Sequence, residues 1–122
     1  MTNTVLIVDD YADARSFLKF LFELGGYRVV EATDGQEAIE QAIAEKPDLI
    51  LMDMSMPKVD GITASRIIKE KMSHSKVPTI IGVTAHGSDY NEKAIEAGCK
   101  TVINKPVSFD VLDSMIAMYM IN

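Results

Sequence analysis

Residues 47–61 of the chain read PDLILMDMSMPKVDG. Within this stretch four apolar residues, 49–52, follow a Pro-Asp break and lead directly to the carboxylate of Asp53, and the Met-Ser-Met-Pro segment behind it cannot continue a strand. An uninterrupted apolar run of this length predicts a parallel strand that is buried on both faces. Because ligands of open α/β sheets bind beyond the carboxyl ends of the strands, Asp53 is predicted to lie where the fold carries out its chemistry.

The rest of the chain alternates short apolar runs with segments of helical periodicity. We expect strands at residues 4–8, 28–32, 49–52, 79–83 and 101–103, and helices at about 12–25, 36–45, 62–72, 89–97 and 109–121, with Asp34 and Ser108 as N-caps. Strands that alternate with helices through short loops predict parallel βαβ units with right-handed crossovers and a three-layer α/β sandwich. Spacing alone leaves the order of the strands open.

Helical periodicity also predicts which side chains face the core. These are Ala14, Phe17, Leu18, Leu21 and Phe22 in the first helix, Ala38, Ile39, Ala42 and Ile43 in the second, and Ala64, Ile67 and Ile68 in the third. Phe20 lies off the first stripe and is either a partner contact or a shielded side chain. The last helix carries more apolar residues than one face needs, which favours a partner face or a weak dimer of an otherwise monomeric protein.

Length, composition and charge limit the remaining possibilities. The 122 residues are expected to form one domain, 1–122, with no output domain after the last helix. A net charge of −6 argues against a nucleic-acid surface, and neither a leader sequence nor an apolar run of about 18 residues is present, so we expect a cytoplasmic protein without membrane contact. The single cysteine, Cys99, is expected to be a small buried hydrophobe.

Polar residues follow four of the expected strands: Asp9 and Asp10, Asp53, Thr84, and Lys105. The carboxyl ends of parallel strands meet at one sheet edge, and three carboxylates within about 5 Å repel by roughly 3 kcal/mol per pair at an effective dielectric near 20. Mg²⁺ suits this all-oxygen set, while an ammonium and a hydroxyl would neutralise a phosphoryl group. We therefore predict phosphoryl transfer with Asp53 as nucleophile, forming an acyl phosphate.

Taken together, these motifs resemble the response-regulator receiver domain of two-component signalling over essentially the whole chain. The resemblance implies a doubly wound, flavodoxin-like sandwich with strand order 2-1-3-4-5. It implies phosphorylation of Asp53, direct Mg²⁺ binding by Asp10, Asp53 and the backbone carbonyl of Ser55, and action of Asp9 mainly through water. Thr84 and Lys105 would hold the phosphoryl oxygens, and the peptide bond before Pro106 would be cis.

The sequence departs from the family pattern at two positions. Val102 stands where the family has the aromatic residue that is coupled to Thr84, and Val107 stands where Phe is usual. Motion of the Thr84 loop toward a phosphoryl group does not require that aromatic ring. Ser55 and His86 occupy positions that set acyl-phosphate lifetime in the family, and we expect their polar side chains to affect it here.

The resemblance predicts a stand-alone receiver that takes a phosphoryl group from a histidine kinase or histidine phosphotransfer protein and signals to a downstream protein target. The only reactions that it would catalyse are uptake of the phosphoryl group and hydrolysis of its own acyl phosphate. A phosphorylation-independent interaction module of the same fold is the alternative, favoured by Val102. An aspartate-nucleophile phosphatase would need a second Asp where Ser55 stands, and a flavin-binding domain would need a phosphate loop where Asp9 and Asp10 stand. Taken singly, Asp9 or Asp10 also suits a helix cap, and Lys105 a solvated surface position.

Overall fold

The computed structural model describes residues 3–56, 59–85 and 91–119. The strands are β1 (Thr4–Val8), β2 (Arg28–Ala32), β3 (Leu49–Asp53), β4 (Thr79–Thr84) and β5 (Cys99–Asn104). The helices are α1 (Ala12–Leu24), α2 (Gly35–Glu45), α3 (Gly61–Lys71), α4 (Asn91–Glu96) and α5 (Phe109–Tyr119). All strand pairs are parallel, and the order β2-β1-β3-β4-β5 confirms the doubly wound arrangement.

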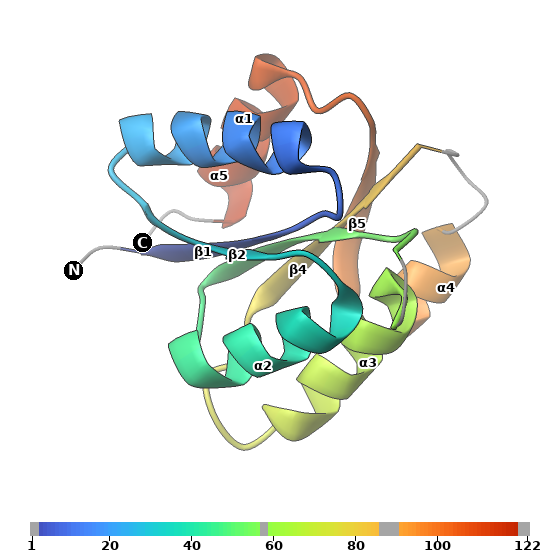
Figure 1. The fold of residues 1–122 in the computed structure, drawn as a ribbon. Coiled ribbons are helices and arrows are strands. Elements are labelled where there is room, and N and C mark those ends of the chain that lie inside the picture. Colours follow the sequence, from blue (N-terminus) through green and yellow to red (C-terminus); the bar gives the residue numbers. More distant parts are fainter. Residues whose placement is uncertain (1–2, 57–58, 86–90, 120–122) are drawn as a thin grey trace.

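The sheet lies between two helical layers, with α1 and α5 on one face and α2, α3 and α4 on the other (Figure 1). Alternate residues of β1 serve the two layers: Val5 and Ile7 join a core with Leu18 of α1, whereas Leu6 and Val8 join the core on the opposite face. Successive side chains of a strand point to opposite faces, so a strand covered on both sides must be apolar throughout. This explains the uninterrupted apolar runs of the sequence.

The predicted elements are confirmed with small changes at their ends. Asp34 caps α2 by accepting a hydrogen bond from the N–H of Glu37 at 2.8 Å, and the Ser108 hydroxyl accepts one from the N–H of Val111 at 3.2 Å. The fifth strand is longer than predicted, at Cys99–Asn104. The predicted beginning of the fourth helix, the predicted end of the fifth helix and His86 lie outside the described residues.

Two side chains predicted to face the core are exposed instead: Phe17 retains 52% of its surface and Ile43 45%. Each directly precedes or follows a buried residue, Leu18 or Ala42, and therefore lies about 100° around the helix from it. The buried stripe is thus narrower than predicted. Phe20 is exposed and Cys99 is buried, both as expected. No helix built from the described residues is both long enough and apolar enough to cross a membrane.

Asp48 ties together three strands at the end of the sheet opposite the predicted site. Its carboxylate accepts a hydrogen bond from the N–H of Thr4 at 2.7 Å and forms an ion pair with Lys76. Its backbone N–H donates to the carbonyl of Thr4 at 2.8 Å, and its carbonyl accepts from the N–H of Thr79 at 3.1 Å. The beginnings of β1, β3 and β4 are therefore held by one residue.

Asp48→Asn is expected to lower the free energy of unfolding at pH 7 by about 1 to 2 kcal/mol, because charged hydrogen bonds contribute more than neutral ones. Burial acts to raise the pKa of Asp48, but Lys76 and the Thr4 N–H together hold it below the ordinary value of 3.8. A carboxyl with a depressed folded pKa stabilises the protein above its unfolded pKa and loses that contribution as the pH falls through the folded value.

The stability difference is therefore expected to be complete above about pH 5 and to decline as the pH falls through the lowered folded pKa of Asp48. Urea unfolding over a pH series measures it, with Asp113→Asn in the exposed part of α5 as the control. A difference that stayed constant across this range would contradict the assigned role of the Asp48 charge.

Gly61, the first residue of α3, lies against the end of β3. A Cβ atom at this position would stand 2.0 Å from the carbonyl oxygen of Asp53 and 2.8 Å from the Cα of Met54. Both neighbours are backbone atoms, which cannot swing aside as a side chain would. Glycine at this position is therefore required by close packing between α3 and β3.

Gly61→Ala is expected to destabilise the protein by about 3 kcal/mol, because either α3 or the end of β3 must move. The sign of this stability change is informative, because alanine in place of glycine within a helix normally stabilises the protein by about 1 kcal/mol. Gly26→Ala is the matched control: it has open space around the added methyl group but a φ of +89°, and is expected to cost only about 1 kcal/mol. Equal stabilities of Gly61→Ala and the parent chain in urea unfolding would show that the packing is looser than described.

Candidate functional site

The first part of the site is the turn that joins β1 to α1. Asp9 follows the last residue of β1 and is only 4% exposed. Its N–H donates to the carbonyl of Ala32 in β2 at 3.1 Å, and its Oδ1 accepts from the N–H of Tyr11 at 2.9 Å. Asp10 follows and is exposed. The turn thus presents one buried and one exposed carboxylate at the carboxyl end of the sheet.

Asp53 is the last residue of β3, which lies between β1 and β4, and it is 3% exposed. Its Oδ1 accepts a hydrogen bond from the N–H of Ser55 at 3.0 Å. The side chain of Asp53 lies on the α1 side of the sheet, because Leu49 and Leu51 of the same strand pack into the core on that side. The carboxylate of Asp53, at the end of β3, therefore points toward the turn that contains Asp9.

Lys105 follows β5 and reaches across to two of these carboxylates. Its Nζ lies 3.1 Å from Oδ2 of Asp9 and 3.2 Å from Oδ2 of Asp53. Its backbone N–H donates to the carbonyl of Thr84 at 2.8 Å, which places the fully buried Thr84 at the same edge. The peptide bond between Lys105 and Pro106 is cis, as the resemblance implied.

Asp9, Asp10 and Asp53 form one acidic cluster, in which ligand oxygens of the three side chains lie within 4.8 Å of one another. At that separation each pair of charges repels by about 3 kcal/mol at an effective dielectric near 20. One ammonium, that of Lys105, contacts two of the three carboxylates. Oxygen donors without imidazole or thiolate suit a hard divalent cation such as Mg²⁺, which keeps part of its water shell. The donor set therefore fits magnesium.

Burial and charge shift the titration of both partners of the central ion pair. Burial, opposed by the Ser55 N–H and Lys105 and reinforced by Asp9, raises the pKa of Asp53 above its ordinary value of 3.8. Burial alone would lower the pKa of Lys105, but Asp9 and Asp53 together raise it above 10.5. Lys105 is therefore cationic throughout the neutral range. The raised pKa of Asp53 means that its negative charge destabilises the folded protein.

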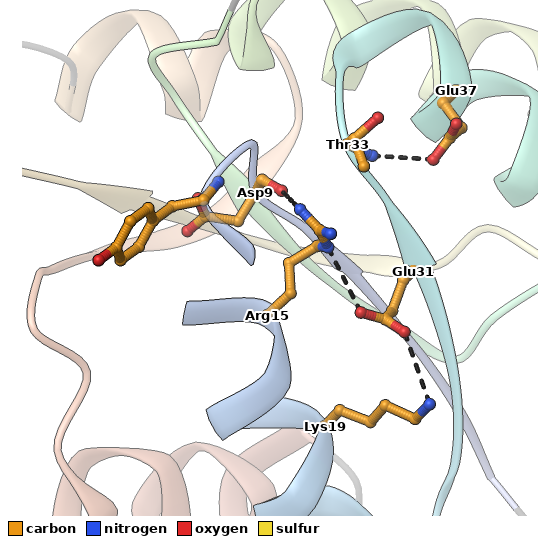
Figure 2. Close-up of polar contacts among 7 residues, drawn as sticks. Asp9, Arg15, Lys19, Glu31, Thr33 and Glu37 are labelled. Atoms are coloured by element: carbon orange, nitrogen blue, oxygen red, sulfur yellow. Dashed lines mark hydrogen bonds and ion pairs between the residues drawn. The ribbon is translucent and has the colours of Figure 1, made fainter. Parts of the chain in front are cut away.

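Arg15 was not identified from the sequence, although it contacts the site. Its Nη1 donates to the backbone carbonyl of Asp9 at 2.9 Å, and its Nε donates to Oε1 of Glu31 at 3.3 Å (Figure 2). The available signal was its position on α1, one turn beyond the pair of acidic residues. An arginine at the border between the buried and the exposed face of a helix usually points into solvent. Its acceptor here is the backbone carbonyl of Asp9, which a pattern of residue types cannot reveal.

A cavity of about 440 Å³ adjoins the acidic cluster on the α1 side of the sheet. Asp9 and Lys105 form part of its lining, and exposed Tyr11 and Phe17 contribute from α1 and the turn before it. Val107, which stands where the family pattern has a larger residue, also lines it. The acidic site is therefore bordered by an apolar surface on this side.

The family model for the response regulator receiver domain matches residues 5–117. The polar-differentiation response regulator DivK of Brucella ovis is 33% identical over 121 residues, which cover 98% of this chain and 98% of DivK. The CAI-1 autoinducer sensor kinase/phosphatase CqsS of Vibrio cholerae is 36% identical over 94% of this chain, but the chain spans only 17% of CqsS.

Two solved structures with the same fold are informative about receivers. One is the co-crystal structure of the Saccharomyces cerevisiae histidine phosphotransfer protein Ypd1 with the receiver domain of Ssk1, with a TM-score of 0.90, 26% identity, and coverage of 97% of this chain and 88% of the matched chain. The other is the receiver domain of the sensor histidine kinase PA1611 of Pseudomonas aeruginosa, with a magnesium ion in its active-site cleft. It has a TM-score of 0.85, 26% identity and 98% coverage of both chains.

Proposed function

Because the chain belongs to the response-regulator receiver domain family, we propose that it is a cytoplasmic phosphoacceptor whose Asp53 takes up a phosphoryl group. One observation carries this proposal above all others: three carboxylates from two strand ends converge, and a single lysine contacts Asp9 and Asp53 together. The cluster stores unfavourable charge that a divalent cation and a phosphoryl group would relieve. As a signalling domain, the chain performs chemistry only on itself.

The proposed step is transfer from a phosphohistidine. A carboxylate oxygen of Asp53 attacks the phosphorus atom, an acyl-phosphate P–O bond forms, and the P–N bond breaks, with its electron pair left on the imidazole, which then takes up a proton. Lys105 stays near the transferred group and balances its negative charge. The hydroxyl of Thr84, at the end of β4, supplies a further donor to the phosphoryl oxygens.

Asp9, Asp10, Asp53 and the backbone carbonyl of Ser55 would hold Mg²⁺, with Asp9 acting mainly through water. When bound, the cation neutralises negative charge on the transferring phosphoryl group. The all-oxygen donor set and the magnesium in the related PA1611 receiver support this assignment. Ser55 is exposed beside Asp53, and we propose that its side chain affects how long the acyl phosphate survives.

We propose that the phosphodonor is a histidine kinase or a histidine phosphotransfer protein that docks on α1. Phe20 and Leu24 of this helix are 59% and 70% exposed, and Phe17 lies beside the cavity that adjoins Asp9. Large exposed apolar side chains near a site favour a protein interface. The Ssk1 receiver, which crystallised with a phosphotransfer protein, supports this type of partner.

A second apolar surface, on α5, is proposed to contact a downstream protein target or a second copy of the chain in a weak dimer. Met118 is 71% exposed, and a groove of about 400 Å³ runs beside it between α5 and β5, with Ile103 and Val111 in its lining. The α5 helix lies on the same face of the sheet as α1, beside the last strand of the order, β5 (Figure 1).

The test is intact-mass spectrometry of the chain incubated with acetyl phosphate in the presence of Mg²⁺ or of EDTA. An adduct of about 80 Da, the mass of one phosphoryl group, is expected only with Mg²⁺. Absence of the adduct, under conditions that label a known receiver, would reject the proposal. It would favour the phosphorylation-independent interaction module, which the valine at position 102 already permits.

A further inference from the structure

We infer that Arg15 is a positioning residue for the divalent-cation site: anchored by Glu31, it holds the peptide bond between the two adjacent carboxylates, Asp9 and Asp10. The inference rests on the proposed function, because it concerns the cation site assigned there. It adds a residue that lies outside the acidic cluster and outside the lysine and threonine that border it.

Arg15 makes two directed contacts from the first part of α1. One nitrogen, Nη1, donates to the carbonyl oxygen of Asp9 at 2.9 Å, and another, Nε, donates to Oε1 of Glu31 at 3.3 Å. The side chain is only 17% exposed. Figure 2 shows the guanidinium extended between the turn after β1 and the carboxylate on β2. A planar group fixed at two nitrogens has little freedom to rotate away.

Glu31 is itself held in place. It belongs to β2, one of the two edge strands, and pairs with Ile7 of β1, so its backbone position follows that of the strand that leads to Asp9. Its second oxygen, Oε2, lies 3.6 Å from Nζ of Lys19, one turn further along α1 (Figure 2). A carboxylate placed between two cations from one helix gives the guanidinium a fixed anchor.

The held carbonyl matters because of Asp10. Among the described residues, no hydrogen bond or ion pair involves the side chain of Asp10, so the direction of this carboxylate depends on its backbone. The peptide unit between Asp9 and Asp10 is planar, and fixing its carbonyl oxygen fixes the orientation of its N–H and of the Asp10 Cα. The N–H of Asp9 is already bonded to Ala32, and Arg15 fixes the other side of the same residue.

Coulomb attraction and positioning predict opposite signs when Arg15 is removed. Loss of a positive charge near an acidic site strengthens divalent-cation binding if charge alone matters. Loss of a positioning contact weakens it, and outer contacts to metal ligands typically change affinity by about 10-fold to 100-fold. Arg15→Met is therefore expected to weaken Mg²⁺ binding by about tenfold. Lys100→Met, which removes an equal charge from an exposed position on β5, is expected to leave the affinity unchanged or slightly increased.

The experiment is isothermal titration of each full-length variant with MgCl₂ alone, supported by circular dichroism in EDTA. Arg15→Lys keeps the charge but can reach only one of the two acceptors, so an affinity about threefold below that of the parent chain is expected. If Arg15→Met does not fold, the Mg²⁺ affinity of Arg15→Lys alone tests whether Arg15 positions the cation site. Mg²⁺ affinities of Arg15→Met and Arg15→Lys equal to or higher than that of the parent would overturn the inference. No Mg²⁺ binding by the parent chain would instead overturn the cation site itself, and the inference with it.

Discussion

Asp53→Asn is expected to abolish phosphoryl uptake from acetyl phosphate completely and, at the same time, to make the protein more stable. Uptake is lost because an amide oxygen does not supply the anionic nucleophile that forms the acyl phosphate. Stability rises because the pKa of Asp53 is raised in the folded state, chiefly by burial, so at pH 7 its charge opposes folding. The variant removes that charge from an acidic cluster that holds three carboxylates within 4.8 Å.

The sign of the stability change depends on pH and on the cation. A carboxyl with a raised folded pKa destabilises the protein above that pKa, and the penalty disappears as the pH falls through it. The gain in Tm for Asp53→Asn is therefore expected in EDTA at pH 7 and is expected to shrink toward acid pH or when Mg²⁺ is added to the parent chain. Intact-mass spectrometry measures uptake, and thermal unfolding followed by circular dichroism measures stability.

Asp48→Asn is the matched control, because it alters a carboxylate at the other end of the same strand. It is expected to take up a phosphoryl group at the parental rate while losing stability, the reverse of Asp53→Asn on both measurements. An adduct on Asp53→Asn comparable to that on the parent chain would show that another side chain is the acceptor.

Lys105→Met is expected to slow phosphoryl uptake by about 10²-fold to 10³-fold, the usual effect of removing one donor that stabilises developing negative charge. Methionine retains an unbranched apolar stem, so the loss concerns the ammonium that lies 3.1 Å and 3.2 Å from Asp9 and Asp53. Mg²⁺ binding is expected to tighten, because the ammonium and the cation compete for the same carboxylate oxygens. Single-turnover uptake from acetyl phosphate and titration with MgCl₂ give the two quantities separately.

The control for this variant is Lys100→Met, which removes an exposed charge from β5. The rate of phosphoryl uptake and the Mg²⁺ affinity of this control are both expected to match those of the parent chain. Uptake by Lys105→Met at the parental rate would exclude the lysine from the transfer step. Slower uptake together with weaker Mg²⁺ binding would mean that Lys105 supports the shape of the site and does not compete with the cation.

The fold and the centre of the site were predictable from sequence because both depend on strand ends. Apolar runs predict the strands, and the polar residue that follows a run is predicted at the carboxyl edge of the sheet, where Asp9, Asp53 and Lys105 lie close together in the structure. Thr84 was found in the same way, as the end of β4. The strand order came from the family resemblance, since a parallel sheet of five short strands allows more than one order.

What could not be predicted depends on contacts to backbone atoms and on the width of a buried face. Arg15 donates to a carbonyl, and Gly61 is required by the carbonyl of Asp53, so in both cases the partner carries no residue signature. Phe17 satisfied the helical spacing but lies at the boundary of the stripe, beside a cavity that the loop between β5 and α5 also lines. Periodicity gives the direction of a face and not its extent.

The close approach of Gly61 to Asp53 also has a mechanical consequence. No side chain separates Gly61, in the first turn of α3, from the peptide of Asp53, so there is no compressible layer between them to absorb a displacement. If the proposed uptake of a phosphoryl group drew the end of β3 toward Lys105, α3 would have to move with it, and the movement would reach Lys71 at the far end of that helix. Such a link between Asp53 and the surface of α3 would not need an aromatic ring at position 102.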